Sequence, residues 1–147
     1  MSTTNTTFQY TANTLFDDVC RLSAFMTKNL SGPEGSLTDE YIITADERDL
    51  YDECLKQTLP NVFEPMLKIG TGYSSDTTNI TINLSVSVDD ERIKTLVEDT
   101  IATCLKYGIL AEYYSVCVNV DLCRIAQNKF AASLALLDKR LFLLKKK

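Results

Sequence analysis

The chain has 147 residues, of which 45% are apolar and 24% are charged, and its net charge is −5. A domain of this length buries roughly 70% of its unfolded surface, so this composition predicts a folded core and argues against wholesale disorder. The polar start lacks the apolar segment of a signal peptide, and no apolar run approaches the ~20 residues of a membrane helix. We therefore expect a soluble protein that is made in the cytoplasm and has no membrane partner.

Histidine is absent, and the five cysteines are scattered along the chain. Without histidine there is no Ser-His-Asp or Cys-His nucleophile, and the commonest general base at neutral pH is missing. The absence of a CxxC pair argues against a zinc site, and each cysteine falls on or beside an apolar helical position, which is typical of a small buried hydrophobe. The cysteines are Cys20, Cys54, Cys104, Cys117 and Cys123. We therefore expect the protein not to be an enzyme and to bind neither a cofactor nor a metal ion.

Acidic residues are the remaining candidates for chemistry. One cluster consists of Asp46, Glu47, Asp49, Asp52 and Glu53. A divalent cation or an acid–base pair uses such groups. Acids are also common in the first turns of a helix, where they complement the helix dipole. A solvated helix face is therefore the favoured interpretation, and it applies equally to the acids at 89–91.

The first half of the chain predicts two helices. Apolar residues recur at helical spacing from about 14 to 30, behind a capping box of Thr14 and Asp17, and the glycines and proline of 31–35 end this helix. A second helix begins at 44–47 with a Thr/Glu capping box, and Pro60 predicts a kink in it. A shorter helical segment then continues until the glycines of 70–75.

Residues 79–88 give the strongest strand signal. They alternate strictly and place Ile80, Ile82, Leu84, Val86 and Val88 on one face. A strand needs partners for its backbone donors and acceptors, so it pairs either within the chain or with a neighbouring subunit. The candidate partners within the chain are 41–44, 68–73 and 8–10.

The acids at 89–91 predict the start of a third helix, which Gly108 closes. From about 111 to 144 the chain contains neither glycine nor proline, and the pattern predicts one long helix, bent near its β-branched run. Two apolar stripes run along it. The first contains Tyr113, Val116, Val120, Cys123, Phe130, Leu134, Leu137, Leu141 and Leu144, and the second contains Val118, Leu122, Ile125, Ala132, Leu136 and Leu143. Either the helix is central in its own bundle and both stripes are filled internally, or the second stripe meets another subunit.

Together these elements predict an α+β, mainly α fold: a bundle of about four helices with one long strand. The strand belongs to a small sheet or hairpin, which is completed either within the chain or by a strand of another subunit. The predicted single domain spans 1–147, with a polar N-terminal arm (1–11), two N-terminal helices with Gly/Pro loops (12–75), the strand (79–88), two C-terminal helices (89–144) and a basic tail (145–147). Charge is uneven along it, because residues 1–100 hold 17 acids and 7 bases whereas 101–147 hold 3 acids and 8 bases.

This layout resembles small proteins from the structural gene clusters of tailed bacteriophages. The resemblance covers about residues 12–142 and rests on three features: the acidic capped helix within Tyr-Ile-Ile-Thr-Ala-Asp-Glu-Arg-Asp-Leu-Tyr-Asp-Glu (41–53), the alternating strand, and the helical end Leu-Asp-Lys-Arg-Leu (137–141). It implies a head-to-tail connector, adaptor or tail-completion protein, that is, a non-enzymatic virion subunit made in the host cytoplasm that assembles as a homo-oligomeric ring. The implied partners are further copies and other phage structural proteins, such as portal or tail components.

The candidate interface lies on the strand and on the last helix. Its residues are Ile80, Ile82, Leu84, Val86, Leu122, Ile125, Leu136, Lys139 and Arg140. Three alternatives stay open: an adaptor or regulatory module that binds one partner protein through a helical groove, a nucleic-acid-binding protein that uses the basic end at 139–147, and an enzyme with a carboxylate metal site. Nucleic acid is the less expected partner, because the whole chain is acidic and no aromatic residues interleave the terminal lysines.

Overall fold

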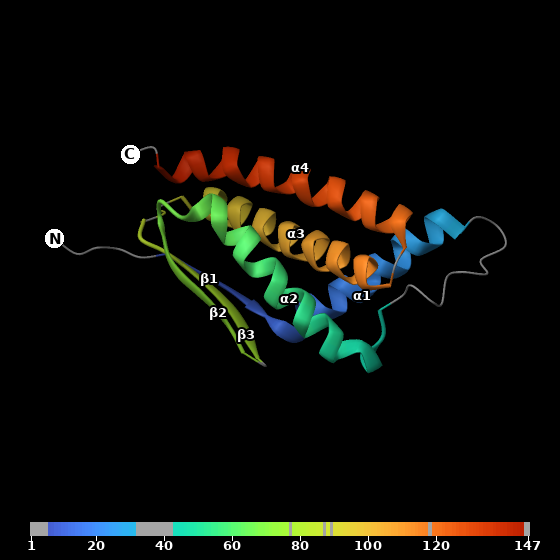
Figure 1. The fold of residues 1–147 in the computed structure, drawn as a ribbon. Helices are drawn as coiled ribbons and strands as arrows, with labels where there is room; N and C mark the ends of the chain where they lie inside the picture. Colours follow the sequence, from blue (N-terminus) through green and yellow to red (C-terminus); the bar gives the residue numbers. More distant parts are fainter. Residues whose placement is uncertain are drawn as a thin grey trace.

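The computed structural model describes residues 6–31, 43–76, 78–86, 88, 90–117 and 119–145, without the side chains of 27–31, 45, 144 and 145. These residues form a mainly α domain with a small antiparallel sheet, as the sequence predicts (Figure 1). The α-helices are α1 (Ala12–Ser31), α2 (Arg48–Phe63), α3 (Glu91–Val116) and α4 (Val120–Lys145), and the strands are β1 (Thr6–Thr11), β2 (Gly70–Ser75) and β3 (Asn79–Leu84). Two 3-10 turns, η3 (Ala45–Glu47) and η4 (Glu64–Met66), flank α2.

The sheet is completed within the chain. Its strand order is β1-β3-β2, and β3 pairs with both neighbours in antiparallel register. Ile82 lies opposite Phe8 on one side and Tyr73 on the other. The predicted partners at 8–10 and 68–73 are thus confirmed, whereas 41–42 of the third candidate lie outside the described residues. The predicted polar arm is in part wrong, because residues 6–11 form β1.

The strand β3 is shorter than the predicted 79–88. After Leu84, the backbone N–H of Ser85 donates to the carbonyl of Ile69 at 2.6 Å, and the carbonyl of Val86 accepts from the Thr6 hydroxyl at 2.6 Å. After these two bonds the chain leaves the β-sheet. It then reaches Asp90, the N-cap of α3, whose carboxylate accepts from the Arg92 backbone N–H at 2.9 Å. The predicted start of the third helix is confirmed.

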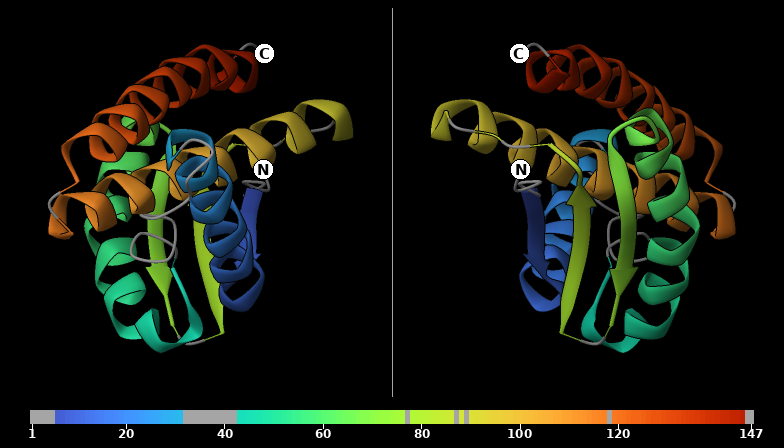
Figure 2. Two further views of the ribbon diagram at one scale, coloured as in Figure 1. Left: turned by 90° about the vertical axis from the view of Figure 1, so that its right-hand side faces the viewer. Right: turned by 90° about the vertical axis from the view of Figure 1, so that its left-hand side faces the viewer.

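The helices form two layers above the sheet. Figure 1 shows α2 and α3 next to the sheet and α4 on the outside, and α3 contacts both α2 and α4. Figure 2 shows α1 on the opposite flank of the sheet from α2. The Tyr10 hydroxyl in β1 donates a hydrogen bond to the backbone carbonyl of Glu98 in α3 at 2.8 Å. This bond connects the sheet to the helical layer. Within the described part of the chain, no helix is both long and apolar enough to span a membrane.

The predicted helix boundaries are right in part. α1 begins at Ala12, so Thr14 lies inside its first turn instead of capping it. At the start of the second helix, half of the predicted capping box is present, since the Thr44 N–H donates to the Glu47 carboxylate at 3.3 Å. α2 continues through Pro60 to Phe63 as one helix. Pro60 is exposed and lies in the last turn, so its missing donor removes only one hydrogen bond near a helix end.

The sequence predicted that Gly108 ends the third helix, and this prediction is wrong. Gly108 lies within α3, at the point where three helices meet. A Cβ atom added at Gly108 would lie 2.9 Å from a ring carbon of Phe130 in α4 and closer still to the Thr58 side chain in α2. The close packing of α2 and α4 on α3 therefore requires a residue without a side chain at this position. Tertiary packing, not helix termination, explains this glycine.

The single long helix predicted for 111–144 is also wrong. α3 ends at Val116, and α4 runs back along α3 from Val120 (Figure 2). Asn119 starts α4, because its side-chain oxygen accepts from the Leu122 N–H at 2.9 Å and its carbonyl accepts from the Cys123 N–H at 3.0 Å. Asn is a strong N-cap residue, and its capping bonds replace those that a continuous helix would form.

Candidate interaction surface

α4 packs on α3 through one buried face. Leu122, Ala126, Leu137 and Leu141 are all buried, and they follow the spacing of one helical face. Near the C-terminal end, the Arg140 guanidinium donates to the Thr100 hydroxyl of α3 at 2.5 Å. One face of α4 is thus fixed along its whole length, from the N-cap at 119 to the last described turns.

The N-terminal half of the second stripe is covered within the chain. Leu122 is buried and Ile125 is half-buried. Together with Lys129 they line one wall of a groove of about 220 Å³. Its other walls come from α1 and α3, through Leu22, Phe25, Met26 and Tyr107. The end of α1 therefore provides the second partner that this half of α4 needs.

The C-terminal half of the second stripe extends beyond α1 and is uncovered. Leu136 and Leu143 are 41% and 43% exposed, Ala132 is exposed, and Leu96 of α3 is 37% exposed. Phe142, on the adjoining side of α4, is 63% exposed. We call Ala132, Leu136 and Leu143, together with Lys129 before them and Lys139 between the two leucines, the α4 stripe. Exposed apolar side chains on one face of a helix are candidates for an interaction site.

The sequence named strand residues as interface candidates, and the structure places them elsewhere. Ile80, Ile82 and Leu84 are completely buried in the core of their own chain, and Val86 is half-buried beyond the strand end. Because β1 and β2 satisfy both edges of β3, neither its side chains nor its backbone is available to another subunit. We therefore do not retain Ile80, Ile82 and Leu84 as an interface, whereas Val86 stays a prediction.

The remaining candidates, Leu122, Ile125, Leu136, Lys139 and Arg140, all lie on α4. They divide into Leu122 and Ile125 under α1, Arg140 in contact with α3, and Leu136 and Lys139 on the surface. Sequence reasoning did not single out Leu96, because its helical spacing matched the buried face of α3. The structure shows instead that Leu96 is 37% exposed.

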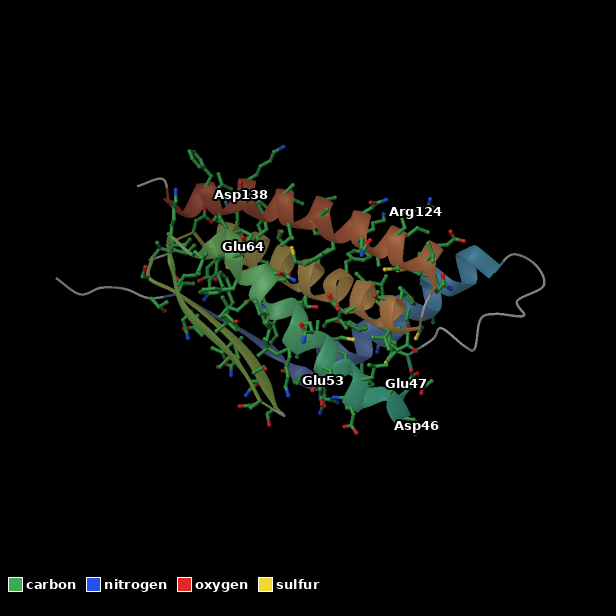
Figure 3. All side chains as sticks on the ribbon, viewed as in Figure 1. Asp46, Glu47, Glu53, Glu64, Arg124 and Asp138 are labelled. Carbon is green, nitrogen blue, oxygen red and sulfur yellow. The ribbon has the colours of Figure 1, made fainter. Side chains whose placement is uncertain are left out.

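The acidic cluster predicted at 46–53 forms an exposed face along α2. Asp46, Asp49, Glu53 and Glu64 are all exposed, and Figure 3 shows Asp46, Glu53 and Glu64 following one another along η3, α2 and η4. Glu47 is different, since its carboxylate accepts a 2.6 Å hydrogen bond from the buried Tyr113 hydroxyl of α3. Burial and this bond raise the pKa of Tyr113. Glu47 thus fixes the start of α2 to α3, whereas Asp52 and Glu53 form ion pairs on α2 itself, with Arg48 at 3.4 Å and with Lys56 at 3.6 Å.

Two of the five cysteines are core residues, and Cys20, Cys117 and Cys123 are half-buried. Cys54 and Cys104 are buried, and burial raises the pKa of each thiol from 9.0 to about 12. Both thiols are therefore protonated and unreactive at neutral pH. Within the residues that the structure describes, no group of three or more Cys, Asp or Glu side chains is arranged to hold a metal ion.

The buried thiols predict a stability change at alkaline pH. A folded-state pKa that is raised above the unfolded value stabilises the fold below the unfolded pKa and loses this contribution as pH rises towards the folded pKa. The free energy of unfolding, measured by urea denaturation, should therefore fall as pH increases above about 9. The Cys54→Ala/Cys104→Ala variant should lose less stability over the same range than the wild type. An equal loss in both proteins would show that these thiols do not carry the effect.

Comparisons with protein-family models, with curated proteins and with solved structures found no match to this chain.

Proposed function

We propose that this protein is a non-enzymatic structural subunit that assembles with further copies of itself through the α4 stripe. The observation that supports this proposal is the half-covered second stripe: α1 covers its first part, whereas Leu136 and Leu143 are left 41% and 43% exposed. Burying such a surface against another protein gains roughly 25 cal/mol for each Å² of apolar area removed from water. A contact between copies would complete the packing of α4.

The specific form that we propose is a ring in the virion of a tailed bacteriophage, as a head-to-tail connector or tail-completion protein. The layout of helices and strand that the sequence shares with such proteins supports this form. In a ring each subunit presents two different surfaces to its two neighbours. The α4 stripe is our candidate for one of them.

The Leu136→Glu variant tests this role of the stripe. A carboxylate at the centre of an apolar contact must be desolvated without a partner, so we expect the dissociation constant of the oligomer to rise at least tenfold. Because Leu136 is 41% exposed, the melting temperature of the monomer should change little. Analytical ultracentrifugation and thermal unfolding measure the two effects separately.

Ala131→Glu is the matched control, since Ala131 is exposed on α4 but lies outside the stripe. It should assemble as the wild type does. If both variants weakened assembly equally, or if neither did, the stripe would not be the contact surface.

A second candidate function is that of an adaptor that binds one partner protein. The groove between α1, α3 and α4 supports it, because its walls are mainly apolar and it carries a single lysine, Lys129, among its lining residues. This arrangement suits an amphipathic helix of another protein with an acidic residue opposite the lysine. A chain that remained monomeric at all concentrations would favour this function over self-assembly.

A further inference from the structure

β1 forms one edge of the sheet, and its backbone groups alternate between the partner strand and the free edge. The N–H of Ala12 donates to the carbonyl of Thr78 at 2.8 Å, directly after the last residues that pair β1 with β3. In an antiparallel ladder every second residue bonds to the partner strand. The even-numbered residues of β1 therefore bond to β3, and N–H and C=O groups point to the free edge at Thr7, Gln9 and Thr11.

The bonds on the other side of β3 agree with this alternation. The N–H of Asp76 donates to the carbonyl of Asn79 at 2.9 Å, and the N–H of Ser85 donates to the carbonyl of Ile69 at 2.6 Å. The odd-numbered residues of β3 thus bond towards β2, which leaves its even-numbered residues for β1. Among the described residues, no backbone hydrogen bond is formed on the outer side of β1.

The free edge of β1 carries none of the features that prevent strands from pairing. Residues 6–11 contain neither a charged residue nor a proline, and the register of β1 with β3 has no bulge. The β2 edge is different, because its register shifts between Gly70 and Gly72 and α2 contacts it. Charges, prolines, bulges and covering helices are the usual protection of an edge strand. β1 is therefore the edge that is open to a further strand.

The unpaired groups of β1 are spaced to match the same edge of a second copy. A two-fold axis at Gln9 sets Thr7 opposite Thr11 of the second copy and Gln9 opposite its own counterpart. Each outward N–H then meets a carbonyl, as in any antiparallel ladder. The side chains of these three residues are exposed and uncharged, so no like charges meet across the axis.

We infer that β1 pairs antiparallel with β1 of a second copy about a two-fold axis at Gln9, which joins two three-stranded sheets into one continuous sheet. This contact goes beyond the proposed function, because it does not use the α4 stripe. Figure 1 shows α4 on the outside of the molecule, with the other helices between it and the sheet. One copy can therefore use both surfaces at once, and the two contacts can fail independently.

Amide hydrogen exchange tests the pairing at single residues. At concentrations where the protein is dimeric, the amides of Thr7, Gln9 and Thr11 should be protected, and on dilution to the monomer they should exchange rapidly. The amides of Phe8 and Tyr10 should be protected at both concentrations, because they bond to β3. Rapid exchange of the three outward amides at every concentration would contradict the inference.

Gln9→Pro removes an outward donor and leaves the bonds to β3 intact. The two-fold axis repeats the loss, so the dissociation constant of the dimer should rise at least tenfold. Gln9→Val is the matched control, since it keeps the N–H and should dimerise as the wild type does. The melting temperatures of the two monomers should be similar. Unchanged dimerisation of Gln9→Pro, measured by sedimentation velocity, would show that this edge is not the contact.

Charges at Gln9 test the position of the axis. Gln9→Lys and Gln9→Glu should each dimerise several-fold more weakly than the wild type, because like charges then lie directly opposite one another. An equimolar mixture of the two variants should form a heterodimer, detected by native mass spectrometry. Thr81→Lys should dimerise normally, since Thr81 lies opposite Gln9 on the central strand, away from the edge. A mixture that associates no better than the separate variants would place the axis elsewhere and overturn the inferred register.

The outcomes separate this inference from the proposed function. The Leu136→Glu variant should still form the β1 dimer, the Gln9→Pro variant should still assemble through the α4 stripe, and the protein with both substitutions should be monomeric. If Leu136→Glu is monomeric at every concentration, the stripe stands and the β1 pairing is wrong. If Leu136→Glu assembles as the wild type does and Gln9→Pro is monomeric, the β1 pairing stands and the stripe is not a contact surface.

Discussion

Ile82→Asp should abolish the native fold. Ile82 is completely buried at the centre of β3, between Phe8 and Tyr73 of the neighbouring strands. A carboxylate there would lose its hydration without a hydrogen-bond partner, at a cost of several kcal/mol, which is comparable to the whole stability of a small domain. Circular dichroism and urea denaturation should show an unfolded chain or a very low unfolding midpoint.

Thr81→Asp is the control for this prediction. Thr81 is adjacent in the same strand but points to the opposite, half-exposed face of the sheet. This variant should fold and lose much less stability. A stable, fully folded Ile82→Asp protein would show that this face of β3 is accessible to solvent and would contradict the structure.

Gly108→Val should destabilise the helical layer. The new side chain would overlap with the Thr58 side chain of α2 and the Phe130 ring of α4. Overpacking of a core typically costs about 1–3 kcal/mol, and here two helices would have to move apart from α3 together. The urea midpoint should fall accordingly. The difference in helix propensity between valine and glycine is small compared with this loss of packing.

Gly72→Val provides the comparison. A Cβ at Gly72 has no atom within 4 Å, so a side chain there meets open space. Substitution at Gly72 in β2 should change stability by much less than substitution at Gly108. Equal effects at the two glycines would indicate that Gly108 is not at a close helix contact.

Elements with strong local signals could be predicted from the sequence. β3 follows from strict alternation over several residues, and the start of α3 follows from its acidic N-cap. β1 was predicted only as one of three candidate strand partners, at 8–10, because Phe8 and Tyr10 alone mark its apolar positions and so short a pattern is hard to distinguish from a polar arm. Its assignment depends on pairing with β3, a contact between residues about 74 positions apart.

The errors in the C-terminal half have a common cause. Gly108 was expected to end a helix and the segment near 117–119 to continue one, and the structure has the opposite arrangement. Tertiary packing decides both positions, because Gly108 allows the helices to approach and the Asn119 cap allows α4 to fold back on α3. Asn119 was a visible signal, since Asn is a frequent N-cap, but the apolar periodicity around it favoured continuity.

The candidate site could be predicted only in part for the same reason. Periodicity identified a second apolar stripe on the last helix, and Leu136 and Leu143 of this stripe lie on the surface. It did not show which half of the stripe α1 covers, nor that β1 and β2 occupy both sides of β3. Both facts depend on contacts between elements that are distant in the sequence.

Self-assembly is the central claim, and the native mass of the purified chain tests it most directly. Light scattering over a concentration series at moderate salt should give a discrete multiple of 16.5 kDa. A mass of 16.5 kDa at every concentration would contradict the claim and would leave the α1–α4 groove, with a different protein as its partner, as the supported alternative.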